Sequence, residues 1–219
     1  MDLMSEGVKT RRRYDSSGRR EQARRTRELL MATAQRQFLE AGYAATTVAA
    51  IAAEVGVSVE TVYKSFGGKS GLVRAIYDRG LLGAGRGAAY ERSDQMRERE
   101  TDPRVIMRKW GELTTEVASV ITPIRLLIRA AAATDPEMAS LLADSDAERL
   151  VRMDHHARFL AERGYLRDGV TVAKAADVLW TCSSAEFYEL LVLNRCWSPA
   201  EFARFVADFM IVALLPPAD

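Results

Sequence analysis

Apolar residues along this chain recur three and four positions apart, which is the spacing of one face of an α-helix. No strand-length window shows the alternation of apolar and polar residues that marks a half-buried strand. A first helix is expected over residues 19–41, and Gly42 would end it. One face of that helix carries Leu30, Ala34, Phe38 and Ala41. The pattern predicts an all-α protein.

Two short helices are expected next, joined by a turn of about three residues. Thr46 or Thr47 can cap the first of them, and Gly56 would end it because glycine accepts a positive φ. Ser58 can cap the second, which would reach Phe66. Small and apolar side chains would hold the pair together: Ile51, Ala52, Val55, Val57, Val62 and Phe66. A fourth helix would begin at Lys69 after a Gly-Gly break.

The second half of the chain repeats one helix-start signal, a capping residue followed by proline. It occurs at Asp102-Pro103, Thr122-Pro123, Asp135-Pro136 and Ser198-Pro199. We therefore expect helices near 103–119, 123–133, 136–163 and 199–215, and a further helix over about 171–193. Four glycines at positions 80, 83, 85 and 87 predict a frayed helix end or hinge before this half.

The expected organisation has four parts. Residues 1–18 form a flexible basic arm, and 19–68 form a three-helix helix-turn-helix domain. Residues 69–87 form a connecting helix and hinge, and 88–219 form a larger helical domain.

Charge is distributed unevenly although the net formal charge is only +1. Residues 1–27 contain nine Lys and Arg against four Asp and Glu, so the remainder is acidic. A basic end on an acidic chain favours a polyanionic partner, and a solvated tail is the alternative. Arg19, Arg20 and Arg24 lie in a first helical turn, where cations oppose the helix dipole. Binding to phosphate groups explains these three arginines better than a contribution to helix stability does.

Several function classes are disfavoured by what the sequence contains. Two cysteines, Cys182 and Cys196, are too few for a disulfide framework, and the N-terminus is polar rather than a signal peptide. The longest apolar run is shorter than a membrane span. A cytoplasmic protein with no membrane association is expected.

The segment from Phe38 to Leu72 resembles the tetracycline-repressor (TetR) family. The matching residues are Phe38, Ala41-Gly42-Tyr43, Thr46-Thr47-Val48, Ile51-Ala52, Gly56-Val57-Ser58, Thr61-Val62-Tyr63, Phe66, Lys69 and Leu72. The resemblance covers roughly residues 20–77. It implies a dimeric transcriptional regulator, most simply a repressor that leaves a palindromic operator when a small molecule binds.

The resemblance also assigns DNA contacts to individual positions. Thr47 and Lys69 would touch phosphates, and Ser58, Thr61, Tyr63 and Lys64 would face DNA from the second helix of the motif. Val59 could contact a thymine methyl group or shield the helix start, and Glu60 could accept from a cytosine amino group or stay solvated. The basic residues Arg11–Arg13 could enter a minor groove. The predicted DNA-binding set is Arg24, Thr47, Ser58, Val59, Thr61, Tyr63, Lys64 and Lys69.

The remaining helices would supply the dimer interface and an effector pocket. The final helix has a wide apolar stripe, with Phe202, Phe205 and Phe209 as the expected interface, although the stripe would also suit an internal core. The resemblance implies a pocket among the middle helices. Its candidate ligand-binding residues are Met107, Trp110, Arg125, Arg129, Trp180, Phe187 and Tyr188.

Other functions have less support from the sequence. There is no nucleophile–base pair, metal-ligand spacing or nucleotide motif, so we expect no enzyme, no catalytic residue and no cofactor. His155 and His156 are adjacent and point in different directions, so no metal site is expected there. A regulator controlled by redox chemistry, or otherwise without a ligand, is the alternative. Cys182 and Cys196 are then its candidates, although a bond between them would require an approach that their positions disfavour.

Overall fold

The computed structural model describes residues 16–83, 85 and 87–217. Within these ranges the chain forms ten α-helices, a π-helical segment and no strand, so the predicted all-α class is confirmed. The N-terminal helices are α1 (Ser16–Ala45), α2 (Val48–Val55), α3 (Val59–Phe66) and α4 (Lys69–Leu81). The others are α5 (Ala89–Arg99), α6 (Pro103–Ala132), α7 (Pro136–Glu162), α8 (Val172–Cys182), α9 (Ala185–Tyr188), η1 (Glu189–Asn194) and α10 (Pro199–Leu214).

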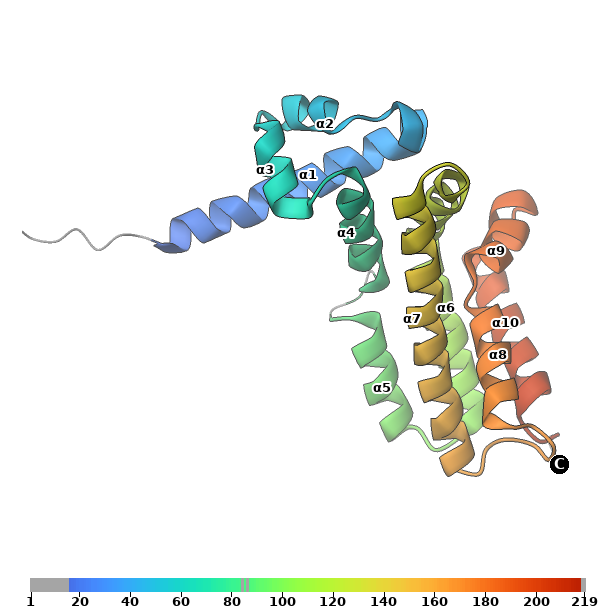
Figure 1. The fold of residues 1–219 in the computed structure, drawn as a ribbon. Helices are drawn as coiled ribbons and strands as arrows, with labels where there is room; N and C mark the ends of the chain where they lie inside the picture. Colours follow the sequence, from blue (N-terminus) through green and yellow to red (C-terminus); the bar gives the residue numbers. More distant parts are fainter. Residues whose placement is uncertain (1–15, 84, 86, 218–219) are drawn as a thin grey trace, which may run out of the picture.

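The first four helices form the unit at the top of Figure 1, where α2 lies on the side of α1 that faces away from the bundle and α3 crosses in front of α1. Leu30, Phe38, Ile51, Val62 and Leu72 are fully buried in its core. Ala41, expected on the same face of α1, is exposed. The regular helix is interrupted at Gly42 (φ 82°), and one further turn reaches Ala45. The first helix begins at Ser16, so residues 16–18, expected in the arm, are helical. Residues 1–15 of the arm, including Arg11–Arg13, lie outside the described residues.

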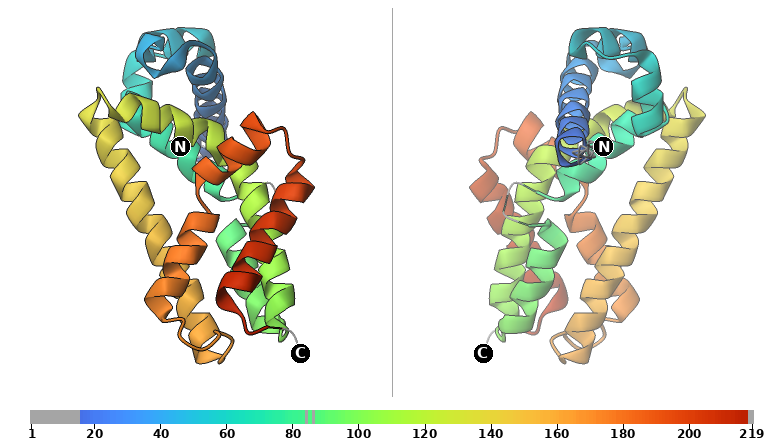
Figure 2. Two further views of the ribbon diagram at one scale, coloured as in Figure 1. Left: turned by 90° about the vertical axis from the view of Figure 1, so that its right-hand side faces the viewer. Right: turned by 90° about the vertical axis from the view of Figure 1, so that its left-hand side faces the viewer.

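Helix α6 links the two halves of the molecule. Its first part contributes Met107 and Trp110 to the core of the helical bundle, and its last part contributes Ile124 and Ile128 to the core of the N-terminal helices. Figure 2 shows α6 and α10 on one side of the bundle and α7 and α8 on the other. A change in the packing of α6 would therefore alter the packing of both cores.

The close approach of α6 and α10 depends on Gly111. A Cβ atom at this position would lie 2.5 Å from the carbonyl oxygen of Ala203 and 3.1 Å from the Cβ of Ala207. Real side chains do not approach a backbone oxygen this closely, so the two helices pack tightly only because this residue has no side chain.

The prediction that a new helix begins at Thr122-Pro123 is wrong, because α6 continues without a break through Pro123. Thr122 is completely buried, and its hydroxyl has no hydrogen-bond partner among the described residues. Proline inside a helix removes one backbone hydrogen bond. Here Ile121 and Ile124 are buried on either side of it, and we attribute the continuity of the helix to that packing.

The single helix predicted over 171–193 is also wrong. The chain leaves the helix at Ser183, and Ser184 caps the short α9 by accepting a hydrogen bond from the backbone N–H of Phe187. Serine hydroxyls compete for backbone hydrogen bonds in this way. Arg149 stabilises the break, because its guanidinium donates to the carbonyl of Trp180 and to the Ser183 hydroxyl.

Helix α5 was not predicted. Its sequence is strongly charged, and its buried positions are Ala89, Ser93 and Arg97 at intervals of four residues. A small, a polar and a charged residue form its inner face, so no apolar stripe signals the helix.

Candidate DNA-binding surface and effector cavity

Helices α2 and α3 form a helix-turn-helix whose ends are fixed by local hydrogen bonds. The Thr47 hydroxyl caps α2 by accepting from the N–H of Ala50 at 3.1 Å, and the Ser58 hydroxyl caps α3 by accepting from the N–H of Thr61 at 3.2 Å. Between them, Gly56 has the left-handed conformation (φ 75°) that ends α2. The capping role of Thr47 resolves the choice between Thr46 and Thr47, since Thr46 is buried and donates to the carbonyls of Gln37 and Gly42.

The outer face of α3 is exposed and carries most of the predicted base-reading residues. Tyr63 is 53% exposed and Val59 is 41% exposed, while Val62 on the inner face is fully buried. Glu60 and Lys64 form an ion pair of 2.8 Å along the exposed face. Glu60 therefore has a partner within α3, besides the base contact and the solvation considered for it above.

Lys69 lies at the start of α4 and is half-buried. Its ammonium lies 4.1 Å from the centre of the Tyr43 ring and 3.5 Å from the carbonyl oxygen of Ala44. Burial lowers the pKa of Lys69, and the nearby carboxylate of Asp135 opposes that shift. Asp135 also caps α7 by accepting from the N–H of Glu137 at 2.9 Å, so the predicted phosphate-binding lysine lies beside the first turn of a bundle helix.

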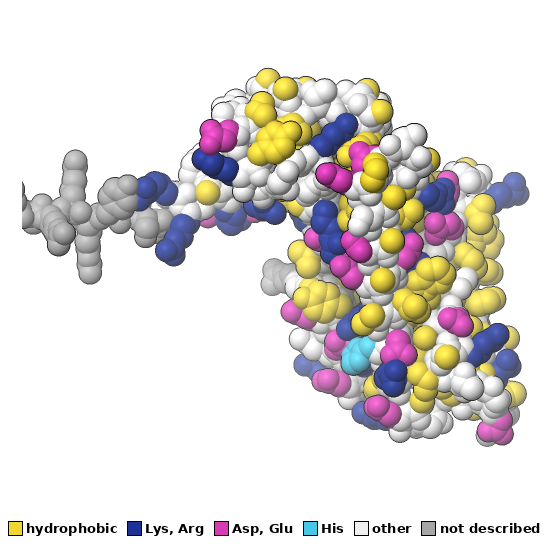
Figure 3. All heavy atoms as spheres, in the orientation of Figure 1, with side chains coloured by type: hydrophobic (Ala, Val, Ile, Leu, Met, Phe, Trp, Pro, Cys, Tyr) yellow, Lys and Arg dark blue, Asp and Glu magenta, His cyan; other side chains and the backbone are white. Residues whose placement is uncertain are grey.

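Arg24 is exposed on α1 and already has acidic partners. Its guanidinium pairs with Glu21 at 2.8 Å and with Glu28 at 2.7 Å. A phosphate contact by Arg24 would have to replace these surface pairs, which are weak in water. Figure 3 shows Lys and Arg side chains along the outlying part of α1, whereas acidic and basic side chains are interspersed over the bundle.

A cavity of about 370 Å³ lies inside the bundle, which is within the usual range for small-molecule sites. Helices α4, α5, α6, α7, α8 and α10 all contribute to its walls. Trp110 is the residue of the predicted ligand-binding set that lines it. The apolar wall includes Leu113, Val117, Leu179, Cys182 and Met210.

The other six predicted ligand-binding residues lie outside this wall. Met107 is fully buried in the bundle core, and Tyr188 packs edge-on against Phe202. Phe187 packs against Phe205, and the Trp180 ring is covered by a guanidinium. Arg129 is half exposed and forms ion pairs with two glutamates of α9 and η1. Arg125 is buried, but next to the cavity rather than on its surface.

Sequence reasoning missed the polar wall of the cavity, which α7 provides. Ser145, Arg149, Arg152 and His156 all line it, at spacings of four, three and four residues. That spacing places them on one face of the helix. A polar stripe at helical spacing was therefore present in the sequence, but it would have been read as a solvated face.

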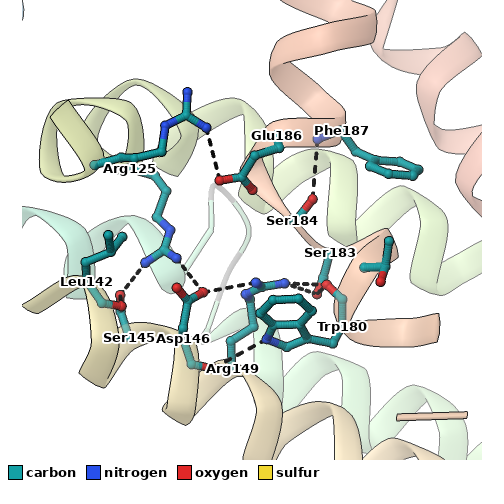
Figure 4. A network of polar contacts seen from close by, with 12 residues as sticks. Arg125, Leu142, Ser145, Asp146, Arg149, Trp180, Ser183, Ser184, Glu186 and Phe187 are labelled. Atoms are coloured by element: carbon teal, nitrogen blue, oxygen red, sulfur yellow. Dashed lines mark hydrogen bonds and ion pairs between the residues drawn. The ribbon is translucent and has the colours of Figure 1, made fainter. Parts of the chain in front are cut away.

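Arg149 belongs to a network that joins α6, α7 and α8, drawn in Figure 4. Arg149 and Arg125 both pair with the carboxylate of Asp146, and Arg125 also donates to the Ser145 hydroxyl. Burial lowers the pKa of Arg149, and hydrogen bonding to Asp146 opposes this shift. The network buries two positive charges with one negative charge between them.

A second cluster lies further along the same wall. Arg152 makes two hydrogen bonds to the Asp94 carboxylate, at 2.7 and 3.1 Å, and Arg97 pairs with the same carboxylate at 3.2 Å. His156 is buried against the Trp110 ring, with the ring centres 4.5 Å apart. Burial and the neighbouring arginines lower the pKa of His156 well below its usual range, so its imidazole is neutral at pH 7.

The expected interface residues of the last helix are not equivalent. Phe202 is completely buried inside the chain, so its prediction as an interface residue is corrected: it packs in the bundle core. Phe205 is half-buried and Phe209 is 42% exposed. Leu190, Leu193 and Val212 are further exposed apolar side chains of η1 and α10.

The two cysteines are both free, and they differ in environment. Cys182 is buried on the cavity wall, and burial raises the pKa of its thiol to about 12. A thiol with so high a pKa is a poor nucleophile at pH 7. Cys196 is exposed. Among the described residues, no group of three His, Cys, Asp or Glu side chains could hold a metal ion.

Two capped helices with a tight turn form a helix-turn-helix with an exposed second helix, and a helical bundle with a cavity follows it in the chain. The sequence pattern of the family described as bacterial regulatory proteins, tetR family, matches residues 30–76, which span these helices. Over this segment the chain is similar to the bacterial regulatory proteins of the tetR family. No curated protein sequence matches it.

Solved structures with the same fold extend over nearly the whole chain. NalD, the secondary repressor of the MexAB-OprM multidrug efflux pump in Pseudomonas aeruginosa, has a TM-score of 0.67 at 21% identity, covering 90% of this chain and 100% of its own. SmeT in complex with triclosan has a TM-score of 0.68 at 21% identity, covering 88% and 92%. Salmonella enterica GusR has a TM-score of 0.63 at 17% identity, covering 87% and 95%. None of the helices described is both long and apolar enough to cross a bilayer.

Proposed function

We propose that this protein is a dimeric repressor that binds a palindromic operator through α3 and leaves it when a small molecule occupies the bundle cavity. The observation that carries the proposal is the combination of an exposed face on α3 with a cavity in the bundle whose wall includes residues of α4. NalD is a repressor and SmeT was solved with a bound small molecule, and both have this fold.

The proposed roles of the individual residues in DNA binding follow from their exposure and charge. Thr47 caps α2 and Lys69 begins α4, and both would position the domain on phosphates. Tyr63 is exposed and Thr61 is half-buried on α3, and both would contact base edges in the major groove. Phosphate contacts set affinity and register, whereas base contacts set the sequence preference.

The exposed apolar surface of η1 and α10 is the proposed dimer interface. Phe209, Leu190, Leu193 and Val212 expose large apolar side chains to solvent in the single chain. A two-fold axis through this surface would place two copies of α3 on half-sites about one helical turn of DNA apart.

The route from effector to DNA runs along α4. Tyr77 and Leu81 line the cavity, and Lys69 begins the same helix eight residues before Tyr77, which is about 12 Å along the axis. An effector that pushes on Tyr77 would shift the start of α4 and so the setting of α3. By linkage, operator DNA would weaken effector binding by the same factor as the effector weakens DNA binding.

Selection of bound fragments from random DNA by the purified protein, at a stated salt concentration, tests the proposal. Recovery of a palindrome with half-sites one helical turn apart would support a dimeric operator-binding regulator. Recovery of no enriched sequence, at a salt concentration low enough for charge-driven binding, would contradict it.

A further inference from the structure

Several polar side chains that line the cavity can donate hydrogen bonds to a ligand. The Tyr77 hydroxyl forms no hydrogen bond to any described residue. Ser93 accepts a hydrogen bond from the Trp110 indole N–H at 3.0 Å, which leaves its own hydroxyl hydrogen free to donate. A ligand whose polar end accepts hydrogen bonds would satisfy both hydroxyls.

His156 adds a third donor because its tautomer is fixed by a neighbour. The Arg97 guanidinium lies 3.4 Å from Nδ1, and a guanidinium can only donate, so Nδ1 is the acceptor of the neutral ring. The hydrogen is therefore on Nε2, which has no hydrogen-bond partner among the described residues. His156 itself lines the cavity.

Two clusters of arginine and aspartate lie behind this wall, and each has a net positive charge. Arg149 shares Asp146 with Arg125, and Arg152 shares Asp94 with Arg97, so each cluster has one more positive than negative charge. Each cluster presents one arginine, Arg149 or Arg152, to the cavity. An excess of buried positive charge is costly unless an anion compensates it.

The acidic groups nearby are not available to a cation. Asp94 and Asp146 do not line the cavity, and Glu148 is the acid found among its described lining residues. The Glu148 side chain is 52% exposed and pairs with Arg74 at 2.7 Å. The aromatic faces are also occupied, since His156 covers Trp110 and the Arg152 guanidinium lies 5.7 Å from the Tyr90 ring centre. The site therefore lacks the open aromatic cage that favours quaternary ammonium ligands.

We propose that the effector is an organic carboxylate with an apolar body, whose carboxylate lies between Arg149 and Arg152 and accepts hydrogen bonds from Tyr77, Ser93 and His156. The apolar body packs against Trp110, Leu113, Val117, Leu179 and Met210. The cavity has the volume of about a dozen water molecules, so it suits a ligand with about a dozen non-hydrogen atoms. This inference rests on the proposed effector role of the cavity and adds the chemical class of the ligand.

Three probes with one apolar body and different head groups test the ligand class directly. They are 4-phenylbutyrate, 4-phenylbutan-1-ol and 4-phenylbutylammonium, each with about a dozen non-hydrogen atoms, which matches the cavity. Binding is measured by isothermal titration calorimetry on the full chain without DNA. We expect the carboxylate to bind at least tenfold more tightly than the ammonium compound, with the alcohol between them, because charge-assisted hydrogen bonds are the stronger ones.

Variants locate the head group. Tyr77→Phe removes only the hydroxyl and should weaken the carboxylate several-fold and the alcohol less, because a hydrogen bond to a charged acceptor is the stronger one. Arg152→Met should remove most of the preference for the carboxylate over the alcohol. Arg158→Met is the matched control, because Arg158 is an exposed arginine of α7 that does not line the cavity, and it should leave all three affinities unchanged.

Equal affinity for the three probes, tighter binding of the ammonium compound, or no binding of any of them would overturn the proposal. The same would follow if Tyr77→Phe and Arg152→Met behaved like Arg158→Met. Because this assay contains no DNA, its outcome is independent of the random-DNA selection. A protein that selects a palindrome but shows no carboxylate preference would refute only the ligand class, and the reverse result would refute only the DNA-binding proposal.

Discussion

Replacing Asp146 by asparagine removes the negative charge that two buried guanidinium groups share. The side chains of Arg125 and Arg149 are only 6% and 14% exposed, and both pair with this carboxylate from opposite sides (Figure 4). Asparagine has nearly the same shape and keeps one acceptor oxygen. The substitution therefore tests the charge rather than the packing.

The expected loss of stability is large for a single substitution. Breaking a buried ion pair by removing one partner costs about 3–5 kcal/mol. The Asp146 side chain is 35% exposed, so solvent screens part of this effect, and we expect about 2–3 kcal/mol. For a chain of this size that corresponds to a fall in the melting temperature of roughly 4–12 °C.

The pH dependence gives the sign of the effect. Burial by itself would raise the pKa of Asp146, but hydrogen bonds from Arg125 and Arg149 outweigh burial and lower it overall. A carboxyl with a lowered pKa in the folded state contributes stability above its unfolded pKa of about 3.9 and loses it as the pH falls through the folded value. The difference between wild type and Asp146→Asn should thus be constant from pH 7 to about pH 5 and shrink below about pH 4.

Urea and thermal unfolding of Asp146→Asn and of the control Asp154→Asn measure this difference. Asp154 pairs with Arg158 on the exposed side of α7, and its loss should cost less than about 0.5 kcal/mol. The double variant with Arg125→Met should recover part of the stability, because one uncompensated charge is then gone. Equal losses for the two aspartate variants, or no recovery in the double variant, would refute the reasoning.

Three further predictions concern other parts of the molecule. Lys69→Ala should weaken binding to all DNA sequences and reduce the slope of log affinity against log salt concentration by about one, whereas Thr61→Ala should change the sequence preference. Fluorescence anisotropy titrations measure both effects. The same effect for both variants would contradict the assignment of Lys69 to phosphate contacts and Thr61 to base contacts. Gly111→Val should force α6 and α10 apart and lower stability by about 1–3 kcal/mol in urea unfolding, and an unchanged midpoint would show that the contact is loose. Phe209→Glu should convert the dimer into monomers in sedimentation experiments; an unchanged mass would place the interface elsewhere.

The N-terminal helices could be predicted from the sequence because their limits are set locally. Thr47 and Ser58 cap through hydrogen bonds to residues three positions ahead, and Gly56 ends α2 through its own backbone conformation. Such signals need no knowledge of tertiary contacts.

The bundle was predicted less completely because distant contacts decide its helix limits. Pro123 carries a start signal, yet burial of the neighbouring isoleucines keeps α6 continuous. The break after α8 is held by Arg149, which lies more than thirty residues away in the sequence. Helix α5 has a charged inner residue, Arg97, whose partners come from α5 itself and α7, and a local pattern cannot show that.

The cavity was the hardest feature to predict. Large aromatic side chains such as Phe187 and Tyr188 are used in packing, whereas arginines and a histidine of α7 form the polar wall. Only the fold shows that this polar stripe faces inward, since the same spacing on an outer face would simply be solvated.

The stoichiometry and specificity of binding to the selected DNA test the central claim most directly. The measurement is a titration of the protein against the selected palindrome and against a scrambled duplex of equal length, at one stated salt concentration. Two protomers should bind each palindrome, with an affinity at least about a thousandfold above that for the scrambled duplex. Equal affinity for the two duplexes, or a single protomer bound per palindrome, would contradict a dimeric operator-binding regulator.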